Sequence, residues 1–209
     1  MKNILAFGDS LTWGADASTG KRHAFTDRWP NVLAAGLGQR ARVIEEGQNG
    51  RMTVHEDPTT FESRNGAVAL PILLKSHEPL DLVIIMLGSN DLKRFRAIDA
   101  MWGMERLIEV VQTFIFNENY AEPQVLIVAP PHLVKTPEED FDALFGHAFE
   151  ESQKFAYHYS RLAKTMGVHF FDASTAAKAD PVDGVHLDAA NTKAIGVALV
   201  PVVKKILGI

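Results

Sequence analysis

The sequence predicts an α/β domain with a parallel, doubly wound sheet, because short apolar runs alternate with helix-like segments along the chain. The apolar runs lack the period-2 alternation of a half-exposed strand. That absence is typical of strands covered on both faces, although periodicity alone does not exclude buried helix. The chain has 209 residues, of which 46% are hydrophobic, so we expect a single domain over residues 1–209.

Four apolar runs are the predicted strands, and a fifth, weaker run at Ala41–Glu45 joins them in the sheet. The four are Ile4–Phe7, Leu82–Leu87, Gln124–Ala129 and Val168–Asp172. In an open parallel sheet, ligands bind beyond the carboxyl ends of the strands. Polar residues that directly follow these runs are therefore the first candidates for a functional site.

Helix-like stretches separate the runs, and three of them show an apolar stripe at helical spacing. The stripes are Trp29, Val32, Leu33 and Leu37; Met104, Leu107, Ile108, Val111 and Ile115; and Phe155, Tyr159, Leu162 and Met166. Gly167 follows the third stripe in the position of a C-terminal cap. Thr136–Glu139 has the pattern of a capping box with proline at the first helical position. A last helix is expected from about Asp188 to Leu207, kinked at Pro201.

The composition disfavours several classes of function. The chain contains no cysteine, which excludes disulfides, cysteine-ligated zinc and thiol catalysis. Lys and Arg number 21 against 26 Asp and Glu, and this net charge of −5 argues against nucleic acid or an anionic membrane as partner. No run approaches the roughly 18 apolar residues of a membrane span, and the N-terminal run is too short for a signal peptide. We therefore expect a cytoplasmic protein.

Ser10 is the candidate nucleophile because it directly follows the first predicted strand, within Gly8-Asp9-Ser10-Leu11-Thr12-Trp13-Gly14. A nucleophilic serine needs such a place, exposed at the end of a sheet yet held by rigid structure. A turn or helix-capping serine is the alternative for this segment taken alone. The pattern Gly-x-Ser-x-Gly is absent, which argues against the nucleophile elbow of α/β-hydrolases.

Two other loops carry groups that can donate a hydrogen bond to an oxyanion. In Gly88-Ser89-Asn90-Asp91, the side-chain amide of Asn90 is such a donor, although an Asx-turn explains this segment better when it is taken alone. In the loop after Ala41–Glu45, either Gly47 or Gly50 can let the backbone approach a ligand and point an N–H group at it. An ordinary loop is the alternative there.

The segment Asp183-Gly184-Val185-His186 supplies a candidate base and its orienting acid. His186 can take the serine proton, while Asp183 orients the imidazole and stabilises its charged form. His186 is the only one of the eight histidines with an aspartate three residues before it. Because Asp188 is expected to cap the last helix, His186 should lie in a loop at the end of the sheet.

Together these segments resemble the four sequence blocks of the GDSL/SGNH hydrolase family, which supply Ser, Gly, Asn and His. The matching segments are Gly8–Leu11, Gly50, Gly88–Asp91 and Asp183–His186. The second block departs from the family pattern, since Glu45 stands where an asparagine is usual. Within the family, the first and third blocks are most similar to bacterial arylesterases. Some of those transfer acyl groups to alcohols or peroxide, and some form large homo-oligomers.

The resemblance implies a flavodoxin-like, three-layer α/β/α fold with a five-stranded sheet. It implies Ser10 as nucleophile, His186 as base and Asp183 as the residue that orients it. The N–H groups of Ser10 and Gly50 and the amide of Asn90 would hold the oxyanion. It implies no metal and no organic cofactor. The expected partners are a small-molecule ester and, in a homo-oligomer, further copies of the chain.

Three residues are candidates for lining the substrate pocket. Trp13 lies three residues after Ser10, Phe95 belongs to the segment after Asn90, and His132 follows the fourth predicted strand. An ordinary loop histidine is the alternative for His132, and a solvated loop is the alternative for the cations beside Phe95. A run of aromatic residues can also wall the pocket, contact another subunit or enter the core. Its members are Phe141, Phe145, Phe149, Phe155, Tyr157 and Tyr159.

These features favour a serine esterase that acts on short-acyl or aryl esters, since no extended apolar lid is evident. A carbohydrate O-acetylesterase, a thioesterase or a lysophospholipase would use the same four blocks, so the blocks do not discriminate among them. Outside enzymes, the alternatives are a binding module or an assembly role on the same scaffold. The presence of Ser10, Asn90, Asp183 and His186 together argues against both.

Overall fold

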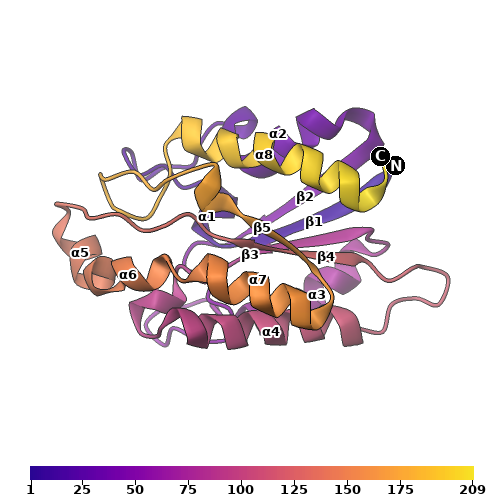
Figure 1. The fold of residues 1–209 in the computed structure, drawn as a ribbon, viewed down its shortest axis with the longest axis horizontal. Coiled ribbons are helices and arrows are strands. Elements are labelled where there is room, and N and C mark those ends of the chain that lie inside the picture. The colour runs from indigo at the N-terminus through magenta and orange to yellow at the C-terminus, as the bar shows by residue number, and fades with distance from the viewer.

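The computed structural model describes residues 1–209 and has three layers, with helices on both faces of a central sheet (Figure 1). The strands are β1 (Lys2–Gly8), β2 (Ala41–Gly47), β3 (Leu82–Met86), β4 (Gln124–Ala129) and β5 (His169–Asp172). All pair in parallel, in the order β2-β1-β3-β4-β5. This order is the flavodoxin-like one, so the predicted fold class is confirmed.

Five longer helices form the two outer layers. One face of the sheet is covered by α2 (Trp29–Leu37) and α8 (Ala189–Leu207), and the other by α3 (Gly66–His77), α4 (Ala97–Thr113) and α7 (Phe155–Met166). The short helices α1 (Ser10–Trp13), α5 (Glu139–Phe145) and α6 (Phe149–Ser152) lie toward the carboxyl ends of the strands (Figure 1). Single 3-10 turns occur at Phe25–Asp27, Gly38–Arg40, Asp91–Lys93, Gly146–Ala148 and Ala173–Thr175.

Alternate residues of the strands face two separate hydrophobic cores. In β3, Leu82 and Ile84 belong to the cluster under α2 and α8, whereas Val83 and Ile85 belong to the cluster under α3, α4 and α7. Every residue of β3 is therefore buried, as expected for a central strand covered on both faces. This double burial explains why the apolar runs show no period-2 alternation.

Two predicted helix ends were wrong. Helix α4 ends at Thr113, so Ile115 lies beyond its stripe and is 89% exposed. Helix α5 begins at Glu139 and is capped by Glu138, whose carboxylate accepts from the Phe141 N–H at 2.7 Å. Thr136 lies three residues before the first helical residue; its hydroxyl accepts from the Glu138 N–H at 3.0 Å in a turn that precedes the helix and donates to the Val182 carbonyl at 2.8 Å.

Two other predicted ends are confirmed. Gly167 closes α7 in the left-handed conformation, with φ +68°, and Asp188 caps α8 by accepting from the Asn191 N–H at 2.7 Å. Helix α3 was not predicted. It contains Pro71, and a proline inside an apolar segment speaks against a helix when only the sequence is read.

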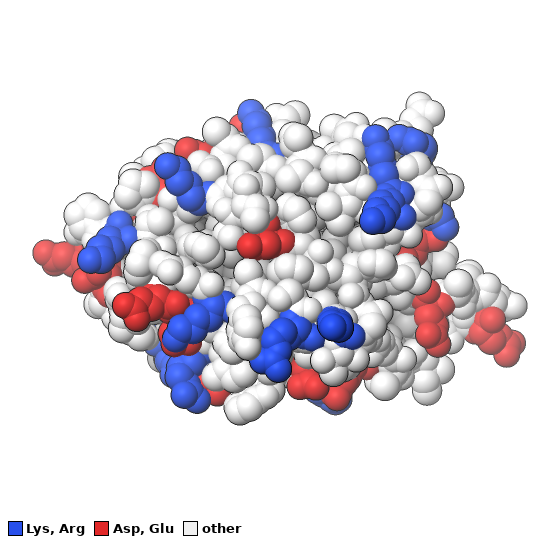
Figure 2. Space-filling view, viewed as in Figure 1, with Lys and Arg blue, Asp and Glu red and all other residues white.

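The surface carries both signs of charge. On the face shown in Figure 2, acidic and basic side chains are interspersed, with no broad region of one sign. None of the helices combines the length and the apolar character needed to span a membrane.

Candidate active site

Ser10 lies where β1 ends and the chain turns into α1. Asp9 caps this helix, since its carboxylate accepts from the Leu11 N–H at 2.9 Å. The turn is tight, because a Cβ added at Gly8 would lie 2.0 Å from the Thr12 hydroxyl oxygen. Ser10 is thus held between a buried strand and a capped helix turn, and only 5% of it is exposed.

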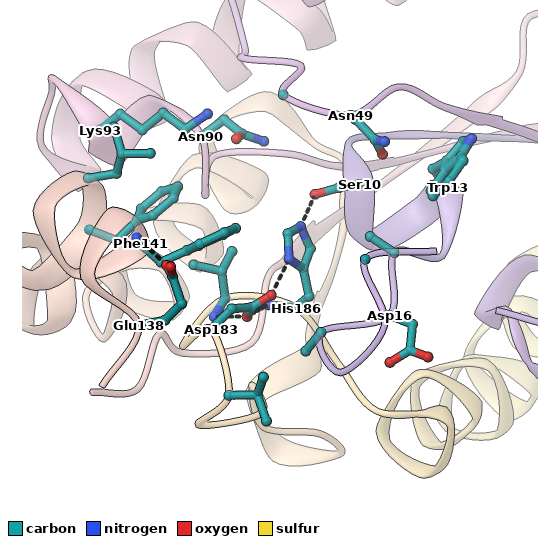
Figure 3. A pocket seen from close by; sticks show the side chains of 18 residues that line it. Ser10, Trp13, Asp16, Asn49, Asn90, Lys93, Glu138, Phe141, Asp183 and His186 are labelled. Carbon is teal, nitrogen blue, oxygen red and sulfur yellow. Dashed lines mark hydrogen bonds and ion pairs between the residues drawn. The ribbon is translucent and has the colours of Figure 1, made fainter. Parts of the chain in front are cut away.

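Ser10, His186 and Asp183 form a continuous hydrogen-bonded chain (Figure 3). The Ser10 Oγ lies 3.0 Å from His186 Nε2, and His186 Nδ1 lies 2.6 Å from Asp183 Oδ2. These distances fit an imidazole that donates from Nδ1 to the carboxylate and accepts the serine proton at Nε2. The structure therefore brings together the three residues predicted to carry the catalysis, although they lie 176 positions apart at the extremes.

Asp183 is held by backbone N–H groups as well as by His186. Its Oδ1 accepts from the N–H groups of Val185 at 2.9 Å and His186 at 2.8 Å. Burial raises the pKa of Asp183, but the hydrogen bonds and the charge of His186 outweigh burial and leave the pKa below its ordinary value. The carboxylate therefore stays ionised beside the imidazole.

Asn90 lies on the other side of Ser10, at the carboxyl end of β3 (Figure 3). Its Nδ2 donates to Asp9 Oδ2 at 3.3 Å and to the Arg51 carbonyl at 3.2 Å. The next residue, Asp91, accepts from both the N–H and the hydroxyl of Thr53, at 3.0 and 2.6 Å. Asn90 is thereby tied to the segments that follow both β1 and β2.

Gly50 supplies a backbone N–H at the rim of the same site. It lines the pocket, has a left-handed φ of +77°, and its N–H makes no hydrogen bond within the protein. Gly47 has a different role, since it pairs with Gly8 at the end of β2 and a Cβ there would lie 2.2 Å from the Trp13 backbone nitrogen. Of the two glycines left open by the sequence, the geometry favours Gly50 as the donor.

Arg51 fixes this glycine loop to the end of the sheet. Its guanidinium donates to the carbonyls of Gly8 at 2.7 Å and Glu46 at 2.6 Å, and lies 4.3 Å from the centre of the Phe7 ring. Burial lowers the pKa of Arg51 to about 10, which leaves it charged. Sequence reasoning missed Arg51, because an arginine that bonds to carbonyls carries no motif of its own.

A pocket of about 390 Å³ opens above Ser10. Its lining comes from α1 and the loop after it, from the loops after β2 and β3, from α5 and the residue before it, and from the loop that carries His186. The lining residues are Ser10, Trp13, Ala15, Asp16, Ala17, Gly20, Asn49, Gly50, Asn90, Lys93, Glu138, Phe141, Leu144, Phe145, Val182, Asp183, Val185 and His186.

Of the three residues predicted to line the pocket, the structure places only one there. Trp13 lines the pocket, whereas Phe95 and His132 do not. The Phe95 ring instead stacks on His55 at a centroid distance of 3.8 Å. His132 follows β4 but does not line the pocket; the next residue, Leu133, is buried and its N–H donates to the Ser152 hydroxyl at 3.0 Å, so this segment packs against α6.

The run of aromatic residues divides between pocket, core and surface. Phe141 and Phe145 line the pocket, Phe155 and Tyr159 are buried in the core, and Tyr157 is 59% exposed. The loop from Ala15 to Gly20, which forms the opposite wall, was not predicted. It contains no periodic pattern or motif that would have indicated its place.

Comparison with protein families gives a match over residues 6–193 to the model of the GDSL-like lipase/acylhydrolase family. The chain belongs to this family. It is therefore a carboxylic ester hydrolase, and the match spans all four segments, from Gly8 to His186, that resemble the family's sequence blocks. A comparison with curated proteins found no significant match.

Several solved structures are similar to this esterase over nearly its whole length. A carbohydrate acetylesterase family member from Sinorhizobium meliloti has 46% identity and a TM-score of 0.98, with 100% of both chains covered. A protein from Agrobacterium tumefaciens assigned as an arylesterase has 51% identity and a TM-score of 0.94, covering 99% of this chain and 100% of its own. The aryl esterase of M. smegmatis has 43% identity and a TM-score of 0.93, with the same coverage.

Proposed function

We propose that this esterase acts by two-step acyl transfer through an acyl-enzyme on Ser10. The observation that carries the proposal is the chain of short contacts from Ser10 Oγ through His186 to Asp183, beside a pocket. In the first step, Ser10 Oγ bonds to the ester carbonyl carbon while its proton passes to His186 Nε2. That proton then goes to the departing alkoxide oxygen as its bond to carbon breaks. In the second step, water repeats the sequence and releases the acid.

The oxyanion of each tetrahedral intermediate would be held by the N–H groups of Ser10 and Gly50 and the amide of Asn90. The unpartnered Gly50 N–H supports this assignment. The two hydrogen bonds of the Asn90 amide are long, at 3.2 and 3.3 Å, so a charged oxygen could take one N–H group from a weaker acceptor.

The substrate class we propose is a small ester with a short acyl or an aryl group. The pocket has a limited volume of about 390 Å³, and Trp13, Phe141 and Phe145 give it aromatic walls. Similarity to an aryl esterase at 43% identity agrees with this class. A carbohydrate O-acetylesterase is the second candidate, favoured by the TM-score of 0.98 to a carbohydrate acetylesterase family member.

The test compares hydrolysis of p-nitrophenyl acetate, butyrate and octanoate by the wild type, Ser10→Ala and the exposed-site control Ser160→Ala. We expect rates that fall with chain length, a loss of at least roughly 1000-fold in Ser10→Ala, and none in the control. A Ser10→Ala protein that keeps its turnover would refute the mechanism. Acetylated sugars, measured in parallel, separate the two substrate classes by their kcat/KM values.

We also propose transfer of the acyl group to alcohols or peroxide, and self-association of the chain. The apolar pocket walls support transfer, because they limit the access of water to the acyl-enzyme.

Exposed Val68 and Ile72 on α3 and Trp102 on α4 support self-association, since a neighbouring copy would cover them. Sedimentation of wild type and Trp102→Glu tests it, with a smaller species expected for the variant.

A further inference from the structure

The pocket contains several charged side chains, and all but one are already paired within the protein. Asp183 holds His186. Asp16 accepts from the hydroxyls of Ser18 and Thr19, both at 2.8 Å. Glu138 accepts from the Phe141 N–H as the cap of α5. The pocket carboxylates therefore already have hydrogen-bond partners within the protein.

Lys93 is the exception. It lines the pocket and is only partly exposed, yet its ammonium takes part in none of the ion pairs or side-chain hydrogen bonds of the structure. The acid that attracts it, Asp57, is engaged by Thr59 at 2.6 Å and by Arg94 at 3.4 Å. The Lys93 ammonium lies over the Phe145 ring, 5.5 Å from the ring centre.

The partial burial of Lys93 also affects its pKa. Burial lowers the pKa of Lys93, and the charges of Asp57 and Asp9 oppose the shift without cancelling it. A half-buried ammonium with no partner is unusual, because such charges are normally paired. An anionic ligand in the pocket would supply the missing partner.

Lys93 is also close in the chain to the reacting atoms. It belongs to the 3-10 turn Asp91–Lys93, and its N–H donates to the Asn90 carbonyl at 3.3 Å. In Figure 3, Lys93 and Phe141 lie on one side of Ser10, while Trp13 and Asp16 lie on the other. A group bound by the Lys93 ammonium would therefore lie on the side of the pocket that Phe141 and Phe145 form.

We propose that Lys93 is a specificity-determining residue that binds a carboxylate carried by the ester substrate. The inference rests on the proposed function, because it concerns the ester bound above Ser10. A charge-assisted hydrogen bond in this partly desolvated site would favour esters with a carboxylate on their acyl or alcohol part over neutral esters of similar size. Lysine can make this contact without the fixed geometry that arginine requires.

The experiment measures kcat/KM for two pairs of substrates. Monomethyl glutarate and methyl butyrate differ in a carboxylate on the acyl part. 4-Acetoxybenzoate carries a carboxylate on its alcohol part, and its methyl ester lacks that charge. In at least one pair, Lys93→Met should lower the ratio of the anionic to the neutral substrate by roughly 10- to 100-fold, and Lys93→Glu should lower it further.

Two controls complete the test. Lys164→Met, at an exposed position of α7, should leave the ratios unchanged, and Lys93→Arg should retain most of the preference. Equal ratios in wild type and Lys93→Met for both pairs would overturn the proposal, even if neutral esters are still hydrolysed. Absence of ester hydrolysis by the wild type would instead count against the proposed function. If Lys93→Met does not fold, Lys93→Gln, which also removes the charge, takes its place, and equal ratios in wild type and Lys93→Gln for both pairs overturn the proposal.

Discussion

Asn90 is positioned by hydrogen bonds that its amide donates to two segments distant in the chain. Its amide donates to Asp9, which follows β1, and to the carbonyl of Arg51, which follows β2. Asn90 itself is buried, with 6% of its surface exposed. An amide held in this way has only to exchange one long hydrogen bond for the substrate oxygen, so little reorganisation is needed when charge develops on the substrate.

Replacing Asn90 with alanine should lower kcat by roughly 100- to 1000-fold, because one oxyanion donor is lost, with a much smaller change in KM. Steady-state kinetics on p-nitrophenyl acetate measure both constants. Asn119→Ala, at an exposed position in the loop before β4, is the matched control. A kcat within about threefold of wild type would show that Asn90 is not an oxyanion donor.

The loop from Ala15 to Arg22 is fastened to the sheet through Glu45. The carboxylate of Glu45 accepts from Arg22 at 2.9 Å, Arg28 at 2.8 Å and Asn31 at 3.0 Å. Arg22 in turn donates to the Trp13 carbonyl at 2.7 Å and lies over the Trp13 ring at 5.0 Å. Glu45, which departs from the usual asparagine of the family, therefore supports one wall of the pocket.

We expect Glu45→Gln to raise KM more than it lowers kcat, because it loosens the wall without touching Ser10. The loss of two ion pairs near the surface should cost about 1 kcal/mol in the free energy of unfolding, or roughly 2–4 °C in Tm. Kinetics and thermal denaturation test this, with exposed Glu122→Gln as the control. An unchanged KM would show that the wall does not depend on Glu45.

The elements differ in how well the sequence predicts them. Strands β1, β3 and β4 and helix α8 were predicted because double burial and an N-terminal cap leave clear local patterns, whereas the half-exposed β2 gave a weaker one. The cap predicted at Thr136 was wrong because Thr136 forms a turn before the helix and bonds to Val182 in a distant loop, which leaves Glu138 as the cap. Phe95 is not a pocket residue because its ring stacks on His55, which lies 40 positions earlier. No local sequence pattern indicates such a contact.

The site as a whole was predictable to the extent that it follows from topology. Ser10 and Asn90 follow β1 and β3, the neighbouring strands where the strand order reverses, and this is where an open sheet binds its ligands. The walls of the pocket were less predictable. Asp16, Glu138 and Val182 come from loops that meet only through the folded chain, and none has a motif.

Two buried carboxylates beneath the site should influence how stability varies with pH. Burial raises the pKa of Asp91 to about 7 and that of Asp9 to about 6, despite the hydrogen bonds that favour their ionised forms. In this range the folded protein binds protons that the unfolded chain has released. The contribution of Asp91 and Asp9 to the free energy of unfolding is therefore largest at low pH and is lost as the pH rises toward 7.

The Asp91→Asn variant should remove part of this dependence. Its free energy of unfolding, relative to that of the wild type, should become more favourable as pH rises from about 5 to about 8, because asparagine cannot ionise. Urea denaturation at several pH values measures the difference. Asp140→Asn, at an exposed position of α5, should show no such trend. A difference that stays constant with pH would mean that Asp91 does not titrate in this range.

The central claim is that Ser10 carries the acyl group, and covalent labelling tests it most directly. Wild type, Ser10→Ala and Ser160→Ala are treated with a fluorophosphonate, and the labelled position is mapped by peptide mass spectrometry. We predict one label on Ser10 in the wild type and in Ser160→Ala, and none in Ser10→Ala. Labelling of another residue, or equal labelling of Ser10→Ala, would contradict the assignment of Ser10 as the nucleophile.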